Sequence, residues 1–214
     1  MSADTVEKLL LLALGWLFGL LSPAIVEAIK RHRETNLVKV ALAAELDEVS
    51  YKLALGNNIL NEHFGTIDHT YLRWLKEVTA NYADPSLVAP LIQGIESQLQ
   101  LTGEQLADLV ALRKAPDHQN VNLQKVVVPL LDARVSSLWH LDSNIQALLL
   151  DIRSQVNLLN EIVDQSRYYS GLTFGKLEGG NYALVVENLK GCQRQHAERA
   201  KQIVNKIQEL RKAL

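Results

Sequence analysis

Residues 181–214 read NYALVVENLKGCQRQHAERAKQIVNKIQELRKAL, and their apolar side chains recur every three or four positions. Wound as an α-helix, the apolar side chains fall on one arc of about 120°. Asn181 is a favourable N-cap, and no Pro interrupts the stretch. We therefore predict one helix from Asn181 to Leu214, about 50 Å long. The arc holds Val185, Val186, Leu189, Ala200, Ile203, Val204, Ile207 and Leu210.

A basic stripe runs along the same predicted helix, beside the apolar arc. Lys190, Arg194, Lys201 and Lys212 lie within about 40° of one another. The helix carries seven Lys or Arg against three Glu, so its net charge is +4 while the rest of the chain carries −6. The stripe is a candidate site for the phosphates of a nucleotide, an oligonucleotide or a lipid headgroup. The alternative is a solvated face, which basic residues near a helix C-terminus favour.

A second long helix is predicted upstream, from about Val121 or Pro129 to Tyr169. Its apolar stripe persists over four heptads, and Arg134 falls within it. The Gly-rich run 171–180 (GLTFGKLEGG) reads as a connector, so the two long helices should form an antiparallel hairpin. The stripe holds Leu138, Leu141, Ile145, Ile152, Val156, Leu159 and Val163.

Shorter helices are expected before the hairpin. The first runs to about Leu55, where Gly56-Asn57-Asn58 supplies turn chemistry, and Asp84-Pro85 stops the second. Thr102 and Gln105 have the spacing of a capping box. The expected helices cover about 59–82, 86–99 and 103–114, and residues 115–120 form a loop.

The N-terminal run Leu9–Val26 (LLLLALGWLFGLLSPAIV) has Ser22 as its only polar side chain. Extended to Ile29, it is about 30 Å long, the thickness of a bilayer core, and predicts a transmembrane helix. Because the first eight residues lack a positive region, a secretory signal peptide is disfavoured. The basic cluster after the run places the C-terminal part in the cytoplasm by the positive-inside rule. The prediction is a single-pass protein of a bacterial-type inner membrane, with its N-terminus outside.

The predicted fold class is therefore all-α: an N-terminal single transmembrane helix followed by a long-helix cytoplasmic bundle or coiled-coil-like hairpin. The predicted domains are 1–29, the N-terminal tail and transmembrane helix, and 30–214, the cytoplasmic helical domain. Within the latter, 30–120 forms shorter helices and 121–214 the long antiparallel hairpin.

Small residues share one face of the predicted span: Gly15, Gly19, Ser22 and Val26. Such a face lets helices pack closely or line a narrow pore. Glu27 follows at the membrane plane. It would place a charged ring at a pore mouth, or else form an i,i+4 pair with Arg31.

Composition and motifs disfavour most enzyme classes. The chain has 214 residues, 48% of them apolar, a net charge of −2 and a single Cys, which excludes a disulfide framework. The histidines show no metal-binding spacing, and His196 falls in the apolar arc, which predicts a hydrogen-bonded core residue. We expect no catalytic residues, no metal and no cofactor. The histidines are His32, His63, His69, His118, His140 and His196.

Two family resemblances bear on function. Arg134 and His140, in RVSSLWH, resemble the Arg-x4-6-His pattern of HEPN ribonucleases, which implies that these two residues act at a scissile phosphate. The apolar span and basic terminal helix resemble, in architecture, the small membrane effectors of bacterial anti-phage defence: the nucleotide-gated effectors of CBASS and type III CRISPR systems and the oligonucleotide-controlled effector of Hailong.

The effector resemblance implies a homo-oligomeric pore-forming or channel-like protein, gated by its cytoplasmic helical domain through a bound nucleotide or oligonucleotide. The expected partners are the membrane, further copies of the chain, a nucleotide or nucleic-acid ligand, and a protein partner. The first alternative is a membrane-anchored helical scaffold that recruits a partner protein. The second is a membrane-tethered HEPN-like ribonuclease.

Overall fold

The computed structural model describes residues 3–82, 84–116, 119–175 and 181–214, without the side chains of 3–10, 13, 14, 17, 20 and 24. The described residues form helices joined by turns and irregular segments, with no strand among them, and the all-α prediction is confirmed. The chain divides into two compact units, residues 1–41 and 42–214, here called the N-terminal and C-terminal units.

The N-terminal unit consists of the first part of helix α1 (Ala3–Phe64). Its described apolar side chains are largely exposed, and the exposed large ones range from Leu21 at 46% to Leu12 at 72%. Glu27 pairs with Arg31 at 2.5 Å, which confirms the predicted i,i+4 pair.

The predicted transmembrane helix is not supported. Among the residues that the structure describes, none of the helices combines the length and apolar character needed to cross a membrane. Charged side chains begin directly after the apolar run, at Glu27. The prediction of single-pass inner-membrane localisation is therefore wrong.

Within the C-terminal unit, α1 does not stop at Gly56-Asn57-Asn58 as predicted, but continues to Phe64. Asn57 is 1% exposed, and its Nδ2 donates a hydrogen bond to the Ala197 carbonyl of α7. This distant partner satisfies a side chain that would otherwise favour a turn. The helix ends instead at Gly65, whose φ of 69° is left-handed and suits glycine.

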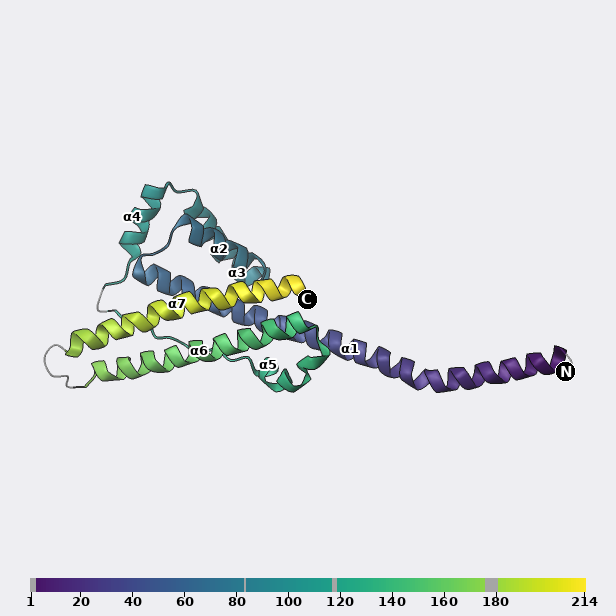
Figure 1. The fold of residues 1–214 in the computed structure, drawn as a ribbon. Coiled ribbons are helices and arrows are strands. Elements are labelled where there is room, and N and C mark those ends of the chain that lie inside the picture. Colours follow the sequence, from purple (N-terminus) through teal and green to yellow (C-terminus); the bar gives the residue numbers. More distant parts are fainter. Residues whose placement is uncertain (1–2, 83, 117–118, 176–180) are drawn as a thin grey trace. The chain divides into compact units, whose positions relative to one another are not determined.

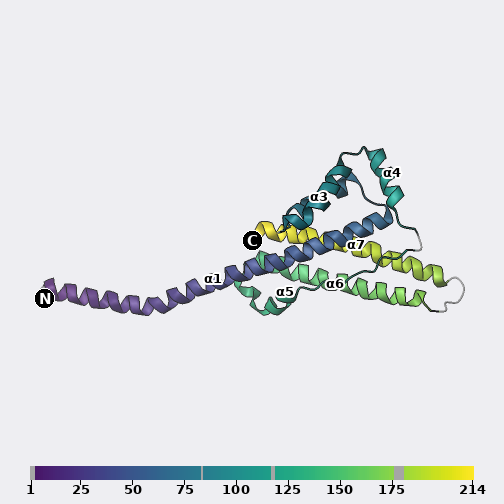
Figure 2. The ribbon, with the colours of Figure 1, turned by 180° about the vertical axis from the view of Figure 1, so that it is seen from behind.

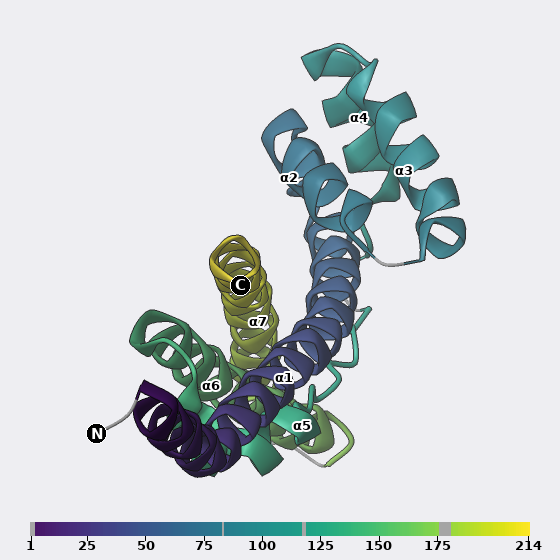
Figure 3. The same cartoon turned by 90° about the vertical axis from the view of Figure 1, so that its right-hand side faces the viewer.

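Three shorter helices follow: α2 (His69–Ala80), α3 (Pro85–Leu99) and α4 (Gly103–Arg113). The helix expected over 59–82 is split between the end of α1 and α2, because Gly65 breaks it. The helices expected over 86–99 and 103–114 are confirmed, including the Thr102–Gln105 capping box. Lys76 of α2 pairs with Glu96 of α3 at 2.7 Å, and Figure 3 shows the blue α2 grouped with the teal α3 and α4.

The predicted unbroken helix from 121 or 129 to 169 is wrong. Residues 121–128 are irregular, and α5 (Pro129–Arg134), the 3-10 helix η1 (Val135–His140) and α6 (Ser143–Thr173) follow. Asn160 pairs with both backbone groups of Val126, at 2.9 and 2.7 Å. Glu45 of α1 accepts the first N–H groups of α5, from Leu130 at 2.7 Å and Leu131 at 2.9 Å. These side chains satisfy backbone groups that a continuous helix would pair internally.

Helices α6 and α7 (Asn181–Ala213) run antiparallel, side by side, in Figures 1 and 2. The predicted apolar stripe of α6 and its continuation in η1 are buried, whereas Arg134, expected within the stripe, is exposed. The arc of α7 is also buried, apart from the half-buried Val186. The connector begins later than predicted, because α6 extends to Thr173; residues 176–180 lie outside the described residues.

A small apolar cluster joins the end of α1 to α6 and α7. Leu60 of α1, Leu123 of the irregular segment and Val163 of α6 are each at most 4% exposed, and Ala197 of α7 packs against them. Trp74 of α2 donates to Asn205 of α7 at 2.8 Å, which ties the short helices to the hairpin. The cluster fixes the end of α1 against the middle of α7, next to the pocket described below.

Candidate anion-binding site

A basic pocket lies where the end of α1, the chain after α4 and the middle of α7 meet. Its volume is about 170 Å³. Three cationic side chains and one histidine contribute to its wall, and none of the lining residues that the structure describes is a carboxylate. The lining residues are His63, Phe64, Thr66, Lys114, Ala115, Pro116, Lys190 and Arg194.

The place of Lys114 depends on a glycine. Lys114 is the C-cap of α4, and its backbone N–H bonds to the Val110 carbonyl. Its aliphatic stem passes over Gly65, where a Cβ atom would lie 3.3 Å from Lys114 Cδ. Gly65 therefore both permits the left-handed turn that ends α1 and leaves room for the Lys114 stem.

Arg194 is held by two contacts from different elements. Its guanidinium lies 5.4 Å from the centroid of the Phe64 ring, a cation–π distance. Its Nη1 lies 3.3 Å from Oε1 of Glu187, which is seven residues, or about two helical turns, earlier on α7. The ring orients the guanidinium at the pocket wall, and 55% of the Arg194 side chain remains exposed.

Two carboxylates close in sequence to the lining residues are each paired with a guanidinium. Glu187 faces Arg194, and Glu62 lies 3.6 Å from Arg113. The ammonium groups of Lys114 and Lys190 add two further positive charges at the wall. The cationic side chains among the described lining residues attract an anion and supply charged donors for its oxygens.

The structure divides the predicted basic stripe. Lys190 and Arg194 are brought together at the pocket, but Lys201 lies over two aromatic rings of α2, 5.9 Å from the Tyr71 centroid and 5.2 Å from that of Trp74. Lys212 is exposed near the end of α7 and lies outside the pocket. The predicted four-residue stripe is thus not one site.

Sequence reasoning missed Lys114 and His63. Lys114 follows Arg113 directly before the 115–120 loop, so a basic pair at a helix end was the available signal. His63 sits in the last turn of a helix that was predicted to end earlier. The sequence alone does not indicate that Lys114 or His63 lies next to α7.

The residues predicted to pack or line a pore lie in the N-terminal unit. Gly15, Gly19, Ser22, Val26 and Glu27 are exposed. An added Cβ at either glycine would meet no described heavy atom within 4 Å. Their role in packing stays a prediction.

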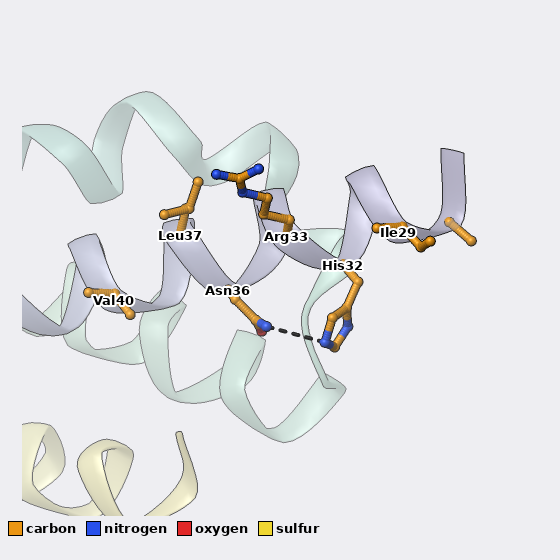
Figure 4. A pocket seen from close by; sticks show the side chains of 7 residues that line it. Ile29, His32, Arg33, Asn36, Leu37 and Val40 are labelled. Atoms are coloured by element: carbon orange, nitrogen blue, oxygen red, sulfur yellow. Dashed lines mark hydrogen bonds between the residues drawn. The ribbon is translucent and has the colours of Figure 1, made fainter. Parts of the chain in front are cut away.

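A shallow groove with a volume of about 570 Å³ lies on the N-terminal unit (Figure 4). Asn36 lies 3.2 Å from the His32 ring within it, and Leu37 and Val40 are more than half exposed. The groove is mainly apolar on the described side chains. It is lined by Ala28, Ile29, His32, Arg33, Asn36, Leu37 and Val40.

His196 is in the core as predicted, at 5% exposure, but it is not hydrogen-bonded as predicted. Neither ring nitrogen has a partner among the described residues. Burial lowers the pKa of His196 to about 4, so the ring is neutral at pH 7. Over the described part of the chain, no group of three His, Cys, Asp or Glu is placed to hold a metal ion. His118 lies outside the described residues.

Arg134 and His140 do not share one helix. Arg134 ends α5 and His140 ends η1, and both are exposed. The His140 ring lies against the Trp139 ring in a tilted arrangement, with ring centroids 3.4 Å apart and an interplanar angle of 33°. The ribonuclease interpretation stays an untested prediction.

Comparison with protein families, with curated proteins and with solved structures found no match for this chain.

Proposed function

We propose that this protein is an all-helical binding protein whose C-terminal unit holds a phosphorylated ligand in the basic pocket. The observation that carries the proposal is that Lys114, Lys190 and Arg194 converge on one pocket, whose described lining residues include no carboxylate. The proposal keeps the phosphorylated ligand that the basic stripe predicted. It restricts the binding site from all four residues of the stripe to Lys190 and Arg194.

The size of the pocket limits what it can hold. A volume of about 170 Å³ suits one or two phosphate groups, and it is below the range of about 300–1,000 Å³ typical of pockets that enclose a whole small molecule. Hydrogen bonds between charged groups contribute about 1.5–3 kcal/mol each. Two or three such bonds sum to about 3–9 kcal/mol before the entropy of association is subtracted, so an isolated phosphate group should bind weakly, with a Kd of roughly millimolar order.

The position of the pocket gives ligand binding a structural consequence. Its wall comes from the end of α1, the chain after α4 and the middle of α7. An anion that bridges these elements holds them together and stabilises the folded state. We propose that ligand occupancy is the input that this helical domain senses.

The proposal is tested by isothermal titration with pyrophosphate. We expect Lys114→Ala and Arg194→Gln each to weaken pyrophosphate binding about tenfold, since each removes one charged contact. Lys212→Ala is the matched control, because it removes the same charge outside the pocket; it should change affinity less than twofold. Equal losses in all three variants, or no binding by the wild type, would overturn the proposal.

A second candidate function, a self-associating helical scaffold that recruits a partner protein, is supported by the N-terminal unit. Its described apolar side chains are exposed, which favours association. In a Cys192→Ala background, Gly19→Cys should form disulfide-linked dimers upon oxidation. Leu21→Cys, about 160° around the helix, is the control. Equal cross-linking at both positions, or at neither, would contradict association through the glycine face.

A further inference from the structure

A second cavity adjoins the basic pocket. Its volume is about 490 Å³, within the range typical of pockets that enclose a small molecule. It lies at the end of the hairpin where α6 stops and α7 begins. The lining residues are Gln119, Asn120, Ser170, Thr173, Phe174, Tyr182, Val186, Leu189, Lys190 and Gln193.

The two cavities are neighbouring compartments with shared walls. Lys190 lines both of them. Helix α7 contributes Gln193 to the larger cavity and the next residue, Arg194, to the basic pocket. The chain after α4 likewise lines the basic pocket at Pro116 and the larger cavity at Gln119. A ligand made of two linked groups can therefore place one group in each cavity, with the link next to Lys190.

The larger cavity differs in chemistry from the basic pocket. Two aromatic residues line it, and both are more than half exposed: Phe174 at 89% and Tyr182 at 56%. Val186 and Leu189 follow on the same face of α7, at the i,i+4 and i,i+7 positions from Tyr182. Aromatic rings beside an apolar wall are suited to a flat aromatic group, because such groups stack on ring faces.

Polar groups at the edge of the larger cavity are held in place. Gln193 is 1% exposed, and its Nε2 donates to Asn120 Oδ1 at 2.5 Å and to the Val121 carbonyl at 3.0 Å. Asn120 Nδ2 in turn lies 3.5 Å from Ser170 Oγ. This chain of amide and hydroxyl groups fixes donors and acceptors next to the aromatic rings. A heteroaromatic base, which carries both donors and acceptors on its edge, matches such a wall better than a hydrocarbon ring does.

We propose that the ligand is a nucleoside phosphate, with its base in the larger cavity and its phosphates in the basic pocket. This inference rests on the proposed function, because it takes the phosphate site as given. Lys190, at the junction, contacts the phosphate nearest the sugar. Phe174 and Tyr182 stack on the base, and Lys114 and Arg194 hold the terminal phosphate.

The test compares ligands that fill one compartment or both. Binding of ADP, GDP, CDP, UDP and pyrophosphate is measured by isothermal titration on the full chain. At least one nucleoside diphosphate should bind ten times more tightly than pyrophosphate, because one stacked base is worth roughly that factor. Tyr182→Ala and Phe174→Ala should remove most of this gain and leave pyrophosphate affinity within twofold. Both side chains are exposed, so their loss should not unfold the protein.

Tyr168→Ala supplies the matched control. Tyr168 is 65% exposed on α6 and does not line the cavity, so its removal should leave all affinities unchanged. If no nucleoside diphosphate binds more tightly than pyrophosphate, the nucleoside inference is refuted and the phosphate site stands. If tight nucleotide binding survives both aromatic variants, the base lies elsewhere and the inference is likewise refuted. If pyrophosphate itself does not bind, the proposed function fails with it.

Discussion

His196 makes the stability of this protein depend on pH. The ring is buried on α7 without a hydrogen-bond partner among the described residues, and burial lowers its pKa from 6.5 to about 4. An unfolded chain therefore binds a proton at His196 between these two values, whereas the folded chain does not. The free energy of unfolding is therefore not reduced by His196 above pH 6.5, and it falls as the pH is lowered from 6.5 towards 4.

The size of the effect follows from the two pKa values. The full difference corresponds to about 3 kcal/mol, of which about 2 kcal/mol is lost between pH 7 and pH 5. Urea unfolding of the wild type and of His196→Leu at pH 5, 6 and 7 measures it. The substitution removes the titrating group and fills the apolar site with a side chain of similar size.

The expected result is a comparison of two slopes. The wild type should lose about 2 kcal/mol more than His196→Leu between pH 7 and pH 5. Carboxylates with altered pKa values, such as Asp47, are present in both proteins and cancel in the difference. His140→Leu, at an exposed position, should behave as the wild type does. Equal pH dependence in the wild type and His196→Leu would refute the reasoning.

Three further outcomes are expected. Gly65→Ala should lower the free energy of unfolding by about 1 kcal/mol or more, because the φ of Gly65 is left-handed. Gly56→Ala should instead raise the free energy of unfolding by about 0.5–1 kcal/mol, because Gly56 lies in the interior of α1 and an added Cβ would meet no atom within 4 Å. Urea unfolding measures both changes. Asn160→Ala should cost about 1–3 kcal/mol because it leaves two backbone groups unpaired, and exposed Asn144→Ala should cost under about 0.5 kcal/mol by the same assay. Pyrophosphate at a hundred times its Kd should stabilise the wild type by about 2.7 kcal/mol and raise its thermal midpoint, an effect that Lys190→Ala should reduce.

Helix α7 was predictable because its information is local. One apolar arc, an N-cap and the absence of Pro fix a helix whose bounds the structure gives as Asn181–Ala213. The α6 stripe was predictable for the same reason, once the helix begins at Ser143. In both cases every third or fourth side chain is buried, and a sequence pattern records that directly.

The errors arose where a side chain finds a partner far away in the sequence. Asn57 continues α1 because it reaches the backbone of α7, and Glu45 and Asn160 stabilise an interruption between residues 121 and 142. Such bonds, 34 to 140 residues apart, have no local sequence pattern. The N-terminal span was predicted from hydropathy alone, a criterion that no helix meets among the described residues.

The candidate site was predicted by half. Lys190 and Arg194 are four residues apart on one helix, so a helical projection places them together. Lys114 reaches the pocket only because Gly65 gives its stem room, which depends on how α4 and α1 meet. A pocket built from three elements is a property of the tertiary fold. Only the pair of residues on α7 could be predicted from the sequence.

The central claim is that the basic pocket binds phosphate groups. Equilibrium dialysis with radiolabelled pyrophosphate tests it most directly, on the wild type, the double variant Lys114→Ala/Lys190→Ala and the control Lys39→Ala/Lys212→Ala. Both double variants remove two lysines, but only the first removes them from the pocket. The prediction is one bound pyrophosphate per chain in the wild type and the control, with at least thirtyfold weaker binding in the pocket variant. Equal binding by the two double variants would contradict the claim.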